Sequence, residues 1–113
     1  MKKLLILLLL PILAYTQSPC NEDICVVQFN AGWNSANDVE WVEKLKDCEI
    51  KYIDIATDAA SQSEYKITVV PTIIVFNDGE EVKRFQADIS FSMKATKEEV
   101  QEVIDEIMIE NSY

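Results

Sequence analysis

Three cysteines and a complete lack of histidine define the chemistry that is open to this chain of 113 residues. The cysteines are Cys20, Cys25 and Cys48. Without histidine there is no Ser–His–Asp or Cys–His nucleophilic site, no histidine general base and no histidine-ligated zinc. Three scattered cysteines do not form a typical zinc set, so we expect no metal and no cofactor. The three thiols are the candidates for disulfide or redox chemistry.

Residues 1–16 have the layout of a secretory signal peptide. Two lysines precede an apolar run over residues 4–10, and small residues surround a cleavage point before Gln17. A membrane span needs about 20 apolar residues, which is more than this run contains. We therefore expect residues 17–113 to form one exported domain, periplasmic or secreted, with no stable membrane insertion after the signal is removed. An oxidising compartment favours a disulfide.

The acidic balance of the chain restricts its partners. Asp and Glu number 20 against 10 Lys and Arg, which gives a net charge of −10. Nucleic acid and anionic membrane surfaces would repel such a chain, so we expect neither as a partner. The region of Asp54, Asp58 and Glu64 lacks the spacing of a calcium loop, and its acidic residues are expected to form a solvated face.

The hydrophobic pattern alternates between strands and helices along most of the chain. Apolar and β-branched runs predict strands, and apolar residues at helical spacing predict helices. The predicted strands are 24–29, 51–55, 72–76 and 82–85, and the predicted helices are 39–45, 59–66 and a last one that Thr96 opens with a capping box to Glu99. Residues 77–80 predict a tight turn between the last two strands. This order predicts an α/β fold with a mixed four-stranded sheet and helices on both faces.

Two separated segments resemble the thioredoxin family. Residues 27–37 (VQFNAGWNSAN) look like the strand and active-site loop in which an aspartate-containing strand runs into Trp-Cys-Gly-Pro-Cys. Residues 69–72 (VVPT), followed by an apolar strand and Asn-Asp-Gly, are similar to the cis-proline segment and hairpin of that family. The resemblance covers residues 24 to about 110 and implies a thioredoxin-like fold.

The residues of the family's redox site are replaced in this chain. Asn34 and Asn37 stand where the nucleophilic and resolving cysteines would be, and Gln28 stands where the buried acid would be. Such a site needs a thiolate at a helix N-terminus, a second thiol and a nearby base. We therefore expect no thioredoxin-type exchange, and no catalytic residue, in the degenerate loop formed by Trp33, Asn34, Ser35, Ala36 and Asn37.

Structural roles account for the replacements. Asparagine is a good N-cap residue, so we expect Asn34, Ser35 or Asn37 to cap the first helix. Gln28 can satisfy its amide within an apolar strand without the cost of a buried charge.

The resemblance implies a cis peptide bond before Pro71. Pro71 either only shapes its loop or keeps a peptide-binding groove together with Trp33, Asn34 and Val70. We expect Trp33 to be partly exposed, where an aromatic side chain is a common contact anchor. The alternative is that Trp33 packs flat against its own loop.

The resemblance also places Cys25 and Cys48 at the same edge of the sheet, opposite the usual active-site end. Three pairings are open, Cys25–Cys48, Cys20–Cys48 and Cys20–Cys25, and a bridge that includes Cys48 is favoured. A bridge of about 25 residues would contribute about 3 kcal/mol through the unfolded state. Cys25 can also be a small buried hydrophobic residue without a partner.

These features support three functional hypotheses. The first is a non-catalytic module that binds a peptide or protein partner. The alternative is a divergent thiol–disulfide oxidoreductase that uses Cys20, Cys25 or Cys48, although nothing nearby in the sequence supplies a positive charge or a helix N-terminus. The third is a subunit whose acidic surface docks on a basic partner.

Overall fold

A computed structural model describes residues 18–113, so the predicted signal peptide lies outside the described residues. The strands form one sheet in the order β2-β1-β3-β4. β1 runs parallel to β2 and antiparallel to β3, and β3 and β4 form an antiparallel hairpin. The mixed four-stranded sheet is as predicted, and its strands are β1 (Ile24–Asn30), β2 (Glu49–Asp54), β3 (Thr72–Asn77) and β4 (Glu80–Gln86).

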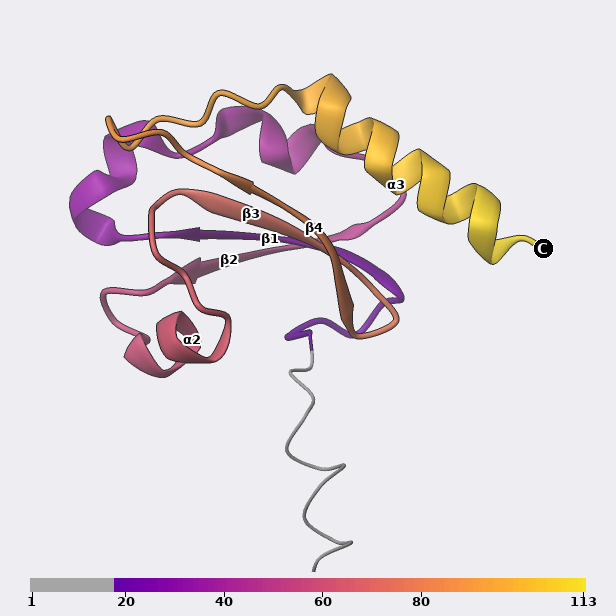
Figure 1. The fold of residues 1–113 in the computed structure, drawn as a ribbon, viewed down its shortest axis with the longest axis horizontal. Coiled ribbons are helices and arrows are strands. Elements are labelled where there is room, and N and C mark those ends of the chain that lie inside the picture. Colours follow the sequence, from indigo (N-terminus) through magenta and orange to yellow (C-terminus); the bar gives the residue numbers. More distant parts are fainter. Residues whose placement is uncertain (1–17) are drawn as a thin grey trace, which may run out of the picture.

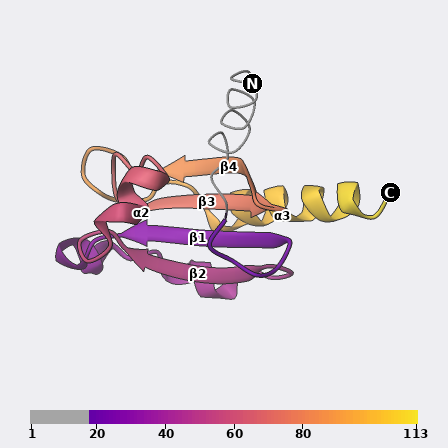
Figure 2. The same ribbon diagram turned by 90° about the horizontal axis from the view of Figure 1, so that it is seen from below.

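Helices lie on both faces of this sheet, as predicted. In Figure 1, α3 (Lys97–Asn111) and the segment between β1 and β2 lie on one face, and α2 (Ala59–Glu64) lies on the other. Figure 2, turned by 90°, shows the strands side by side in the order β2-β1-β3-β4. The architecture is therefore a three-layer α/β arrangement.

β1 is the centre of the molecule. All seven of its residues are buried, because it pairs on both sides and is covered on both faces. Successive side chains of a strand point to opposite faces. Ile24 and Val26 accordingly enter the core under α3, whereas Cys25, Val27 and Phe29 enter the core on the α2 face.

The type of helix predicted for residues 39–45 is wrong. Two 3₁₀ segments, η1 (Gly32–Asn37) and η2 (Glu40–Lys44), occupy the region between β1 and β2. Val39, Val42 and Leu45 are all buried, as the apolar pattern requires. Their spacing is three residues throughout, which matches the 3.0 residues per turn of a 3₁₀-helix better than the 3.6 of an α-helix.

The last helix and the hairpin turn follow the sequence closely. Thr96 and Glu99 form the predicted capping box at the start of α3, and Val100, Ile104 and Ile107 are its buried residues. In the hairpin, Asp78 has φ 54° and Gly79 has φ 88°, and two consecutive positive values are what a type I′ turn requires.

Candidate functional site

The loop after β1 is held by a network of buried amides. Asn34 is only 6% exposed, and its Nδ2 donates to Asn30 Oδ1 at 3.1 Å and to the carbonyl oxygen of Phe91 at 3.3 Å. Its Oδ1 accepts from Asn37 Nδ2 at 2.8 Å. Asn30 Nδ2 in turn donates to the Asn34 carbonyl at 3.2 Å. Asn34 thus joins the end of β1, its own loop and a loop far along the chain.

The predicted capping role of this loop is wrong. The N-cap of η1 is Ala31, no side chain caps η1, and Asn34 interrupts η1 with φ −114° and ψ 20°. The reason is that the amide of Asn34 is engaged in the buried network, while Ser35 is exposed. The expectation for Gln28 is confirmed for the amide oxygen, because Oε1 accepts from the Val39 N–H at 2.8 Å.

Trp33 is exposed over 67% of its surface, so its predicted partial exposure is confirmed. It does not rest flat on its own loop. Its ring meets Phe91 edge-on, with centroids 5.4 Å apart. Phe91 is 41% exposed and has φ 63°, so the two rings form a small aromatic surface at the carboxyl end of β1.

A turn around Asp88 holds Phe91 in place. The Ser90 hydroxyl, the Ser90 N–H and the Ser92 N–H all donate to Asp88, and Lys94 lies 3.5 Å from it. These hydrogen bonds, that of the Ser90 hydroxyl first, lower the pKa of Asp88 to about 2. The turn is therefore built around an ionised carboxylate.

The Val70–Pro71 peptide bond is cis, as the resemblance implied. Both side chains are buried, so only the backbone at this point is open to a ligand. The carbonyl of Pro71 accepts from Ala87 N at 3.0 Å. In residues 18–113, neither the N–H nor the carbonyl of Val70 makes a hydrogen bond.

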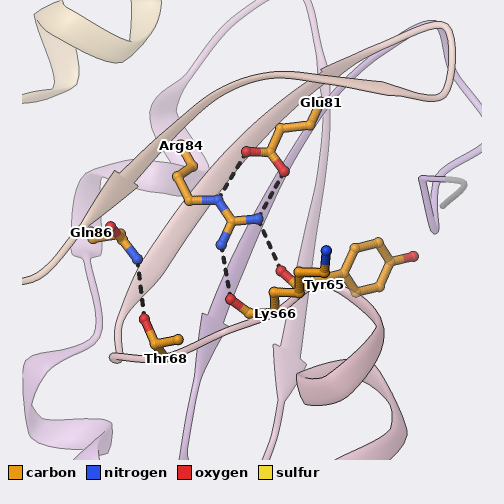
Figure 3. A network of polar contacts seen from close by, with 6 residues as sticks. All are labelled: Tyr65, Lys66, Thr68, Glu81, Arg84 and Gln86. Carbon is orange, nitrogen blue, oxygen red and sulfur yellow. Dashed lines mark hydrogen bonds and ion pairs between the residues drawn. The ribbon is translucent and has the colours of Figure 1, made fainter. Parts of the chain in front are cut away.

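Arg84 on β4 anchors the chain that leads to the cis-proline (Figure 3). Its guanidinium donates to the carbonyls of Tyr65 at 2.9 Å and Lys66 at 3.1 Å. The same group makes a two-point contact with Glu81, at 2.8 and 2.9 Å, which lowers the pKa of that carboxyl. The hairpin thus fixes the segment between α2 and β3.

At the opposite end of β1, Cys20 and Cys25 form a disulfide, with their Cα atoms 6.2 Å apart. The favoured pairing with Cys48 is wrong, and Cys48 is free. Cys25 is in register with Glu49, so these neighbours point to the same face and Cys48, one residue earlier, points to the other. The disulfide packs in the α2-face core, and Cys48 packs against the core under α3.

The two bonded cysteines differ in access. Cys25 is fully buried, whereas Cys20 is half-buried in the lead-in to β1. Lys51 donates from Nζ to the Pro19 carbonyl at 3.3 Å, which brings an ammonium group to the residue before Cys20. This disulfide conflicts with the expectation of a redox-inactive chain, and it lies outside the loop of residues 33–37.

The free thiol of Cys48 has low reactivity. Burial and then the charge of Asp47 raise the pKa of its thiol to about 11. At neutral pH it is therefore protonated and a poor nucleophile.

Comparison with solved structures identifies the architecture. The chain is similar to the N21Q mutant thioredoxin from Halobacterium salinarum NRC-1, with a TM-score of 0.63 and 23% identity over 75% of this chain and 74% of that one. The chain has a thioredoxin-like fold. It is also similar to thioredoxin from Schistosoma mansoni (TM-score 0.59, 20% identity, 78% of this chain and 80% of that one) and to thioredoxin 1 from Thermosipho africanus TCF52B (TM-score 0.59, 18% identity, 79% and 99%). No family model and no curated protein matches the sequence.

Residues 18–113 contain no group of three His, Cys, Asp or Glu side chains arranged to hold a metal ion. None of the helices in that range is long and apolar enough to span a bilayer.

Sequence reasoning missed Phe91 and Lys51. Phe91 contacts Asn34 and Trp33, and Lys51 contacts Pro19. Both contacts join residues that are far apart in the sequence. The Asp-x-Ser-x-Ser pattern of residues 88–92 is the one local signal that predicts a fixed turn before Lys94.

Proposed function

We propose that this protein is an exported thiol–disulfide oxidoreductase that uses Cys20 and Cys25. The observation that carries the proposal is the disulfide between these two residues at the amino end of β1, in which Cys20 is half-buried and Cys25 is buried. Residues 1–16, with the layout of a signal peptide, support export to a compartment in which such a bond persists.

The different access of the two sulfurs supports a division of roles. In the reduced protein, the thiolate of half-buried Cys20 attacks a substrate disulfide, a mixed disulfide forms, and one substrate thiolate leaves. Cys25 then attacks the Cys20 sulfur, which releases the second substrate thiol and restores the protein disulfide. The two protein thiols supply the two electrons, and their protons end on the two substrate thiols. The ammonium of Lys51 near Pro19 favours the Cys20 thiolate.

The experiment is a redox titration of the purified chain, read by alkylation and intact mass. A functional pair is expected to titrate between roughly −270 and −120 mV, the range of known oxidoreductases. Cys20→Ser is expected to abolish reduction of a disulfide-bonded peptide, and Cys48→Ser is the matched control that should retain it. A pair that stays oxidised below about −300 mV would mark a structural bridge and would refute the proposal.

A second candidate function is the binding of an extended peptide, and the backbone of Val70 favours it. Its N–H and carbonyl are free of hydrogen bonds in residues 18–113 and stand beside the cis-proline. An extended segment of a partner can pair with such a backbone as an added strand. Trp33 and Phe91 offer the exposed aromatic area that anchors contacts.

Pull-down with immobilised extended peptides tests this candidate. Trp33→Ala is expected to weaken retention, and Ser35→Ala, in the same loop, is the control. Equal retention by both variants would count against peptide binding at this end of the sheet.

A further inference from the structure

A cavity of about 290 Å³ lies between the ends of β1 and β2 and the loop that follows β1. Its lining includes Gln28, Asn30, Asp38, Tyr52 and Asp54. The cavity is on the far end of the sheet from the disulfide, since Cys25 pairs with Glu49 near the start of these strands and Asn30 pairs with Asp54 at their end. Its volume suits one large side chain rather than a whole protein element.

The two carboxylates of the cavity each have one oxygen in use and one free. Asp54 Oδ1 accepts from Gly32 N at 3.1 Å and Ala56 N at 2.9 Å, and Asp38 Oδ1 accepts from Asn30 Nδ2. Within residues 18–113 the Oδ2 atoms of both aspartates accept no hydrogen bond, and neither aspartate has an ion pair. The cavity thus presents two free anionic acceptors whose carboxylates are oriented by backbone and amide donors.

Gln28 provides an independent sign that the cavity receives a ligand. Its side chain is 4% exposed, and its orientation is fixed because the Val39 N–H can only donate to Oε1. The Nε2 group makes no hydrogen bond within residues 18–113. Since none of the enclosed side-chain polar atoms in that range lacks a partner, Nε2 is open to solvent, and Gln28 lines this cavity. An amide donor that no protein group engages can donate to a ligand that enters the cavity.

Tyr52 adds an aromatic ring to the lining of the cavity. It is 55% exposed, and its ring stands at the cavity that Asp38 also lines. Burial, and then the charges of Glu43 and Asp38, raise the pKa of its phenol, so the ring lies within the field of these carboxylates. An aromatic face beside anionic groups is a favourable place for a planar cation.

We infer that this cavity binds the guanidinium group of an arginine carried on an extended segment of a partner protein. The planar guanidinium donates to the two free carboxylate oxygens and stacks on Tyr52, which a point charge such as an ammonium or a metal ion does not do. The peptide carbonyl of the same segment accepts from Gln28 Nε2. The net charge of −10 attracts a basic segment over distance. This site is separate from the thiol chemistry proposed above and does not depend on it.

The test is a titration followed by ¹⁵N NMR of the intact domain with N-acetyl-arginine methylamide. Three comparison probes accompany it: the citrulline analogue, which has the same shape without charge, the lysine analogue, which has the charge without the planar guanidinium, and n-propylguanidine, which has the guanidinium without a peptide carbonyl. We expect the arginine probe to bind tightest and to shift the side-chain amide signal of Gln28 and the backbone signal of Gly32. n-Propylguanidine should shift the backbone signal of Gly32 and leave the Gln28 amide signal in place.

Matched variants locate the contact. Asp38→Asn and Asp54→Asn keep the oxygen that accepts the structural hydrogen bonds, and each should weaken the arginine probe about tenfold, the cost of losing one charged hydrogen bond. Glu40→Gln removes one carboxylate from η2 outside the cavity lining and should change the affinity less than about twofold.

Four results would overturn the inference. They are equal binding of the arginine and citrulline probes, equal binding of the arginine probe and n-propylguanidine, an unshifted Gln28 amide, and an effect of Glu40→Gln as large as those of the aspartate variants. None of these readouts involves a cysteine, so a failure here is distinguishable from failure of the proposed thiol exchange.

Discussion

The two ends of β1 carry different kinds of side chain. At its carboxyl end, where a thioredoxin-like site is expected, Asn34 and Asn37 form a buried hydrogen-bond network with no thiol. At its amino end, where only a scaffold is expected, Cys20 and Cys25 form a disulfide. The comparison shows that the fold alone does not determine which end of β1 carries thiols, and that asparagine side chains in the loop after β1 can hold it by buried hydrogen bonds.

The largest effect is expected from breaking the amide clamp. Asn34→Ala leaves Asn30 Oδ1, Asn37 Nδ2 and the Phe91 carbonyl without this partner, and should lower the free energy of unfolding by about 3 kcal/mol. Urea unfolding measures this loss of free energy. Ser35→Ala, at an exposed position in the same loop, should stay within about 0.5 kcal/mol. A similar loss in both variants would contradict the clamp.

The next effect concerns the free thiol at the amino end. The pKa of Cys48 is about 11, so alkylation at pH 8 should be about a hundredfold slower than for a thiol of pKa 9.0. The rate should rise with a midpoint near pH 11 in the folded chain and near 9 in urea. An identical pH profile in both states would show that burial does not protect Cys48.

The same shift has a consequence for stability. The folded state holds the Cys48 proton more tightly than the unfolded state, so the unfolded state binds fewer protons once the pH exceeds about 9. The contribution of the thiol to stability is complete below pH 9 and is lost as the pH rises toward 11. Cys48→Ala should remove that part of the decline in unfolding free energy.

A smaller effect is expected for the disulfide. Cys20→Ser opens a short loop and should lower the free energy of unfolding by about 2 kcal/mol. Adding reductant to the wild type should reproduce the loss, and adding it to Cys20→Ser should change nothing. A further loss in the reduced variant would show that another bridge forms.

The smallest effect is expected at the Asp88 turn. The pKa of Asp88 is about 2 against an ordinary 3.8, so the turn's stabilisation is present above pH 4 and is lost as the pH falls toward 2. Release of Phe91 should then alter the fluorescence of Trp33, its ring partner. Asp88→Asn should reach the altered spectrum at neutral pH, and Asp23→Asn, in the lead-in, should leave it unchanged.

The sheet and the last helix were predictable because their signals are local. The β-branched runs, the Asp78–Gly79 turn and the Thr96–Glu99 box each act within a few residues. The 3₁₀ geometry was readable from the strict three-residue spacing of Val39, Val42 and Leu45, but not from amphipathicity alone.

The sites depended on information that a local pattern does not contain. The predicted pairing of Cys25 with Cys48 was wrong because Cys48 points to the opposite face of the sheet from Cys25. That orientation follows from the register in which Cys25 lies beside Glu49, and the sequence alone does not give this register. The position of Asn34 was clear from the sequence, but its partner Phe91 comes from a loop 57 residues later. Contacts of this kind are set by tertiary packing.

The Arg84 contacts also have a consequence for sequence variation among related chains. One guanidinium satisfies two carbonyls just after α2 and a carboxylate on its own strand, so three separate acceptors depend on one side chain. A chain that loses Arg84 must supply another donor for Tyr65 and Lys66, or change the end of α2. Positions 81 and 84 are therefore expected to vary together, and a lysine at 84 to be rare because it lacks the planar fork.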